Sequence, residues 1–91
     1  MEARAKITVN GRVQGVFFRY NAKKQAIINN LKGHVKNMPN GSVDIIIEGE
    51  KYKIDNFIAW CHEGSASSQV DSVSVEWQDF KNEFTIFDVR Y

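Results

Sequence analysis

Residues 11–19, on which the prediction of the fold rests, read Gly11-Arg12-Val13-Gln14-Gly15-Val16-Phe17-Phe18-Arg19. They join an alternating apolar strand to an expected helix through a glycine-containing turn. Backbone N–H groups of such a turn and of the first helical turn converge on one point and favour an anion there. The planar guanidinium of Arg19 adds donors that match the oxygens of a phosphate. The segment therefore predicts one half of a phosphate site.

Composition is that of a small globular protein. The chain has 91 residues, 43% of them hydrophobic, and a net charge of +1. We expect a single domain over residues 1–91, and a monomer, without the strong basic field that recruits nucleic acid or anionic membrane. Cys61 is the only cysteine, so no internal disulfide can form and a reducing compartment is expected. With no apolar signal or spanning segment, we place the protein in the cytoplasm.

Hydrophobic periodicity predicts an alternation of strands and helices. Period-two alternation predicts strands near residues 5–9, 33–37, 42–48, 73–77 and 87–91. A helix over residues 18–30 is expected to bury Phe18, Ala22, Ala26 and Ile27, and one over residues 50–63 to bury Ile54, Phe57, Ile58 and Cys61. Gly49 is expected to end the third strand. This order favours an α+β fold, with two helices on one face of an antiparallel sheet of four to five strands.

The predicted topology brings two distant residues to one edge of the sheet. The first helix is a crossover, so the first two strands should run parallel, with the third strand between them. The carboxyl ends of parallel strands share an edge, so Arg19 and Asn37 should approach each other there. One intervening strand puts their backbones about 10 Å apart, a span that two side chains can bridge.

A resemblance to a known family adds to this interpretation. The first motif, then Gly33-His34-Val35-Lys36-Asn37 and Asn40-Gly41-Ser42-Val43, resemble the acylphosphatase family, as does the ending Phe87-Asp88-Val89-Arg90-Tyr91. The resemblance implies a ferredoxin-like βαββαβ fold and hydrolysis of acyl phosphates to carboxylate and phosphate. It implies that Arg19 binds the phosphoryl group and that Asn37 positions the attacking water. The backbone amides of Gly15, Val16, Phe17, Phe18 and Arg19 correspond to the family's phosphate-binding loop.

Three positions depart from the family pattern. His34 stands where an aromatic residue is common, Asn30 where a helix-ending glycine is common, and Ser65-Ala66 where Gly-Pro is frequent. None of them is Arg19 or Asn37, so we expect these changes to affect stability and rate more than the reaction itself.

The implied chemistry needs no cofactor and no metal. An acyl phosphate is already reactive, so the protein mainly has to position the phosphoryl group and stabilise its charge. The amide of Asn37 offers an acceptor and a donor for one water. Neither Arg19 nor Asn37 titrates near neutrality, so the proton of that water is expected to pass to a phosphate oxygen. The expected partners are a small-molecule acyl phosphate and inorganic phosphate as product or inhibitor.

Other polar residues receive structural interpretations. His34 lies three positions before Asn37, so its side chain should leave the opposite face of the strand. Cys61 falls on an apolar stripe and should pack in the core. Lys23 and Lys24 should form a solvated helix face. Gln14 is expected to shape the loop, and whether its side chain also contacts substrate stays open.

Two rival functions remain open. RNA-recognition modules share this order of elements, but they stack bases on aromatic residues of their central strands. Here the outward face of the third strand carries Asp44, Ile46 and Glu48, so binding of nucleic acid is not expected. The second rival is a phosphate-sensing module without turnover, and the presence of both Arg19 and Asn37 argues against it.

Overall fold

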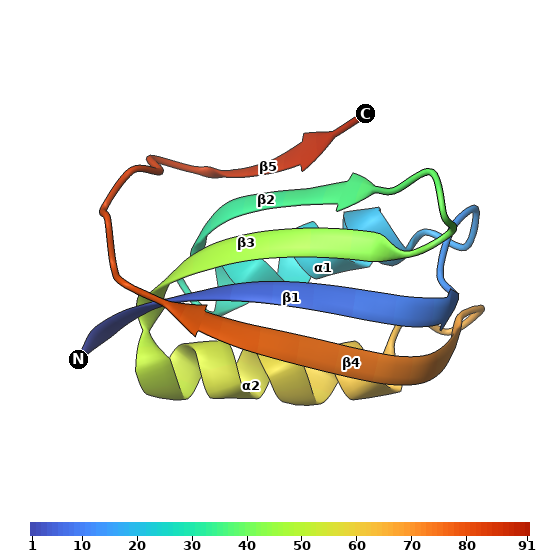
Figure 1. Cartoon of the computed structure of the whole chain (residues 1–91), viewed down its shortest axis with the longest axis horizontal. Helices are drawn as coiled ribbons and strands as arrows, with labels where there is room; N and C mark the ends of the chain where they lie inside the picture. The colour runs from blue at the N-terminus through green and yellow to red at the C-terminus, as the bar shows by residue number, and fades with distance from the viewer.

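Five strands and two helices form two layers in the computed structural model, which describes all residues from 1 to 91 (Figure 1). The elements are β1 (Glu2–Arg12), α1 (Phe18–Ile28), β2 (Lys32–Asn37), β3 (Val43–Glu50), α2 (Lys51–Glu63), β4 (Gln69–Gln78) and β5 (Phe87–Arg90). Both helices cover the same face of the sheet, as the sequence predicted (Figure 1). Neither helix has the length and apolar character needed to cross a membrane.

The sheet has the strand order β4-β1-β3-β2-β5. Strand β3 pairs antiparallel with both β1 and β2, so β1 and β2 run parallel with β3 between them, as expected. The expectation of an antiparallel sheet was wrong at one place, because β5 pairs parallel with β2. Strand β4 runs antiparallel to β1, and the chain then crosses the end of the sheet to its other edge. On its return, β5 must therefore take the direction of β2.

The core lies between the sheet and the helices. Alternate residues of β1 and β3 point into it, and Phe18, Ala22 and Ala26 of α1 are buried against it, as predicted. Ile54, Phe57 and Cys61 of α2 are also buried, with Ile58 half-buried beside them. The prediction for Ile27 was wrong, because its side chain is 61% exposed on the flank of α1 that faces the β5 edge.

The expected break at Gly49 was also wrong. Gly49 pairs with Ala3, and β3 continues to Glu50. A side chain at position 49 would approach Leu31 to 2.5 Å, so the glycine makes room for a core residue inside the strand.

A buried ion pair secures the loop over residues 79–86, which leads from β4 to β5. The Glu48 side chain is only 3% exposed and accepts backbone hydrogen bonds from Lys81 (2.8 Å), Asn82 (3.1 Å) and Glu83 (3.1 Å). Arg4 donates to the same carboxylate at 3.3 Å. The loop therefore covers the Glu48 end of the outward face of β3, a face on which an RNA-recognition module would need an open stacking surface.

Candidate active site

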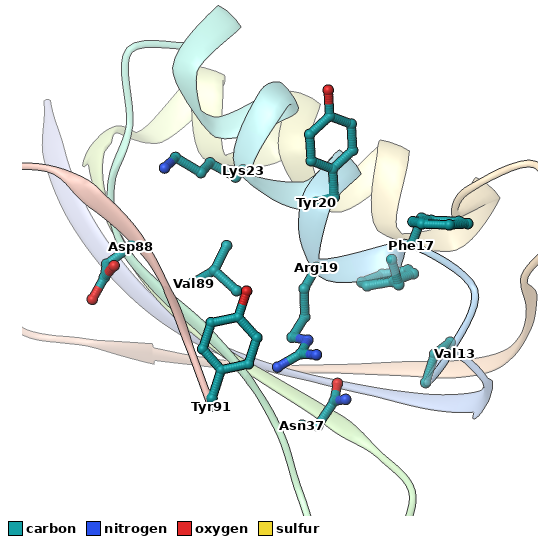
Figure 2. Close-up of a pocket in the computed structure, with 11 residues that line it drawn as sticks. Val13, Phe17, Arg19, Tyr20, Lys23, Asn37, Asp88, Val89 and Tyr91 are labelled. Atoms are coloured by element: carbon teal, nitrogen blue, oxygen red, sulfur yellow. The ribbon is translucent and has the colours of Figure 1, made fainter.

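The strands β1, β2 and β5 end toward the same edge of the sheet (Figure 1), and a cavity opens there (Figure 2). Its volume is about 660 Å³, within the range of roughly 300–1,000 Å³ typical of small-molecule sites. The lining residues are Val13, Gly15, Phe17, Phe18, Arg19, Tyr20, Lys23, Asn37, Asp88, Val89 and Tyr91. Arg19 and Asn37 therefore share one cavity, as the parallel arrangement of β1 and β2 predicted.

The loop before α1 presents unpaired backbone donors. The N–H groups of Gly15, Val16 and Phe17 make no hydrogen bond within the protein. Both Gly15 (φ 73°) and Phe17 (φ 61°) have left-handed backbone conformations, which turn the chain sharply before the helix. Helix α1 begins without a capping side chain and without an acidic residue in its first turn. Its first-turn donors therefore remain free for an anion.

Two side chains hold this loop in place. The Gln14 amide donates through Nε2 to the carbonyl oxygens of Met38 (2.8 Å) and Ser42 (2.9 Å), which fastens the loop to the β2–β3 turn. Ser65 donates through Oγ to the carbonyl of Val16 at 2.8 Å. Gln14 thus shapes the loop, since Nε2 donates to two backbone carbonyls. The sequence offered no sign of the role of Ser65.

The Arg19 guanidinium is held at one end and free at the other. Its Nη1 donates to the carbonyl of Arg90 at 3.0 Å, and the ring of Tyr91 lies 4.6 Å from its Cζ. Arg19 has no ion-pair partner in the protein. Because a guanidinium carries five N–H donors, most of them remain for an anion in the cavity.

Asn37 ends β2 with its amide pointing toward the guanidinium of Arg19 (Figure 2). Its Oδ1 is buried and has no hydrogen-bond partner in the protein. A buried acceptor without a partner is rare and costs about 1–3 kcal/mol, so it marks a place where a water or ligand supplies the missing bond.

The remaining predicted site residues divide between cavity and core. Gly15 and Phe17 line the cavity, Phe18 both lines the cavity and packs in the core, and the Val16 side chain is buried in the core. Sequence analysis did not predict that Tyr91, Val89 and Lys23 line this cavity. Alternation along β5 signalled that Val89 and Tyr91 share a face, but not that β5 lies beside β2.

Other reactive side chains lie outside the cavity. His34 packs against Phe84 at 5.7 Å, and burial, with the charges of Arg90 and Arg4, lowers its pKa. Burial raises the pKa of the Cys61 thiol well above its usual range, so Cys61 is a poor nucleophile. No three His, Cys, Asp or Glu side chains gather closely enough to share a metal ion.

Comparisons with known proteins agree over nearly the whole chain. The family model described as Acylphosphatase matches residues 5–89. An acylphosphatase of Geobacter metallireducens is 44% identical over 91 residues, which cover 100% of this chain and 98% of that protein. The crystal structure of acylphosphatase from Bacillus subtilis superposes with a TM-score of 0.94 at 35% identity, covering 100% of both chains. An acylphosphatase structure from Coxiella burnetii gives a TM-score of 0.93 at 36% identity, covering 98% of this chain and 93% of that one.

Proposed function

Because the chain belongs to the acylphosphatase family and is an enzyme of acyl phosphate hydrolysis, we propose that Arg19 and the loop amides bind the phosphoryl group and that Asn37 positions the attacking water. One observation carries this proposal. The unpaired N–H groups of Gly15 and Phe17, the free donors of the Arg19 guanidinium and the unpartnered Oδ1 of Asn37 all belong to residues that line one cavity.

Binding comes first in the proposed mechanism. The backbone amides of residues 15–19 and the guanidinium of Arg19 take the oxygens of the phosphoryl group. These donors are already oriented, so they stabilise the charge of the transition state without reorganising. Tyr91 and the carbonyl of Arg90 keep the guanidinium aimed at the cavity.

Water attack completes the reaction. The Oδ1 of Asn37 accepts a hydrogen bond from a water and so orients the lone pair of its oxygen toward phosphorus. As the new P–O bond forms, the bond between phosphorus and the carboxyl oxygen breaks, and its electron pair leaves with the carboxylate. The proton of the water passes to a phosphate oxygen, because neither Asn37 nor Arg19 can accept it near neutral pH. The products are a carboxylate and inorganic phosphate.

The test compares turnover with phosphate binding. Phosphate release from benzoyl phosphate is measured for the unmodified chain, Arg19→Ala and Asn37→Ala, with a chelator present, and phosphate binding is measured by calorimetry. Removal of one oriented group typically costs ~10²–10³ in rate, and we expect that loss in kcat for both variants. Arg19→Ala should also weaken phosphate binding, whereas Asn37→Ala should preserve it.

Arg12→Ala is the matched control, since Arg12 is an exposed arginine seven positions earlier that does not line the cavity. Its kcat and phosphate affinity should equal those of the unmodified chain. Full turnover by Asn37→Ala would refute the role in positioning water. Loss of turnover on chelation would refute metal-free hydrolysis, and no turnover by the unmodified chain would favour the sensing module.

A further inference from the structure

A second cation lines the cavity one helical turn beyond Arg19. Lys23 lies four residues later on α1, so both side chains leave the same flank of the helix (Figure 2). The ammonium of Lys23 has no ion-pair partner in the protein. Lys24, the next residue, lies over the ring of Tyr20 at 5.8 Å and does not line the cavity. The two lysines therefore face different surroundings although they are adjacent in sequence.

The cavity is larger than a phosphoryl group requires. The cavity has a volume of about 660 Å³, and Phe17, Arg19 and Asn37 lie toward one end of it (Figure 2). Val89 and Lys23 line the other end, toward β5 (Figure 2). If the phosphoryl group binds at the first end, the second end is left for the acyl group, over the apolar surface of Val89 and within reach of an ammonium.

The charges at this second end favour an anion. Lys23 is the cation there, and Asp88 is the acidic residue that also lines the cavity. Asp88 follows Phe87 and precedes Val89 on β5, so its side chain leaves the opposite face of the strand. Its carboxylate lies 3.9 Å from Nε of Arg90, on that same face. The Asp88 carboxylate is therefore paired with Arg90 and not with Lys23.

The chemistry of the subsite favours a carboxylate over a second phosphate. Phosphate sites usually combine several donors, as the loop before α1 does. Lys23 offers one compact ammonium at the end of a flexible stem, with no accompanying arginine or helix N-terminus. A single ammonium beside the apolar surface of Val89 suits a ligand that carries one negative charge on a short organic chain.

We propose that Lys23 makes the enzyme selective for acyl phosphates whose acyl group carries a carboxylate about one helical turn (~5.4 Å) from the anhydride carbonyl. The substrate class is the monophosphate anhydrides of dicarboxylic acids. This inference rests on the proposed function, since it takes the phosphoryl group to lie against Arg19 and the loop amides.

The experiment uses two rigid substrates of similar shape, 4-carboxybenzoyl phosphate and 4-carbamoylbenzoyl phosphate, which carry an ionised carboxylate and an uncharged carboxamide at the para position. The kcat/KM ratio of the two substrates is measured for the unmodified chain and for Lys23→Met, Lys23→Arg and Lys24→Met. Binding of the two corresponding benzoylphosphonates, which lack the labile anhydride, is measured by calorimetry on the same proteins. This arm reports on the subsite without turnover.

A solvent-accessible ion pair contributes about a fivefold preference at most, so we expect a ratio of about three to five in favour of the carboxylate. Lys23→Met should bring the ratio to one, while Lys23→Arg and Lys24→Met should keep it. The preference should shrink at high salt, because screening weakens an exposed pair.

The inference is overturned if Lys23→Met keeps the ratio, or if Lys24→Met lowers it equally, which would indicate general attraction by surface charge. Failure of the proposed function would give a different result, because neither of the two acyl phosphates would then be hydrolysed faster than in the absence of protein. The phosphonates would still decide whether Lys23 recognises the carboxylate.

Discussion

Replacement of Glu48 by glutamine should weaken the anchoring of the loop over residues 79–86, which leads to β5. Glu48 Oε2 accepts from the backbone N–H groups of Lys81 and Asn82 and from Nη1 of Arg4. Oε1 accepts from the N–H of Glu83. A glutamine keeps only one acceptor oxygen, so its NH₂ group would have to face one of these donors.

The cost follows from burial. Both side chains of the Arg4–Glu48 pair are almost fully buried, at 8% and 3% exposed. Removal of one partner from a buried pair typically costs 3–5 kcal/mol. Arg4 keeps two other partners, the Glu83 carboxylate and Oε1 of Gln78, so we expect a cost at the lower end of this energy range. We expect Glu48→Gln to lower the free energy of unfolding by about 3 kcal/mol and Tm by about 12–24 °C.

The assay is urea unfolding followed by tryptophan fluorescence, with Glu50→Gln as the matched control. Glu50 pairs with the N-terminal amine at the surface, where its side chain is 40% exposed, so its loss should cost no more than about 1 kcal/mol. Equal losses of stability in the two variants would refute the argument from burial.

The pH dependence gives a second check. Burial by itself raises the pKa of Glu48, but hydrogen bonds from the Lys81 and Glu83 amides and from Arg4 outweigh it and lower the pKa below 4.5. A depressed pKa stabilises the fold fully above the unfolded pKa, and this contribution is lost as the pH falls through the folded pKa. The stability gap between the unmodified chain and Glu48→Gln should therefore narrow in acid. If the difference in unfolding free energy between the two proteins stayed constant as the pH fell, the stabilising role of the ionised Glu48 carboxylate would be contradicted.

Two further predictions concern the active site. Tyr91→Ala removes the ring that lies 4.6 Å from the Arg19 guanidinium, so KM for benzoyl phosphate should rise about two- to fivefold in steady-state kinetics. Tyr91→Phe should restore it, and a failure to do so would assign the effect to the hydroxyl instead. The rate should change little between about pH 6 and pH 8, because no titrating side chain takes part in the proposed mechanism. A limb with a histidine-like pKa in the profile of kcat against pH would contradict that mechanism.

Much of the fold was accessible from local pattern. The apolar alternation, the two helical stripes and the glycine-containing turn predicted the elements and their order. The parallel arrangement of β1 and β2 then followed from the helical crossover between them, and it brought Arg19 and Asn37 to one edge. These features depend on residues close together in sequence or on general rules for connecting strands, so a single sequence is enough to predict them.

The rest of the site depends on where distant segments meet. The position of β5 beside β2 is set by the path of the loop over residues 79–86, which Glu48 holds from another strand. The path of this loop places Tyr91 beside Arg19 and closes the cavity that Lys23 lines. No local sequence pattern indicates either contact.

The sequence by itself thus determined the turn before α1 and brought Arg19 and Asn37 to one edge of the sheet, because turn chemistry and strand direction are local. The tertiary structure alone decided how the cavity is closed, which of two adjacent lysines enters it, and that Ser65 and Gln14 hold the loop. Those contacts join residues far apart along the chain, and the free energy that selects them comes from packing the whole sheet.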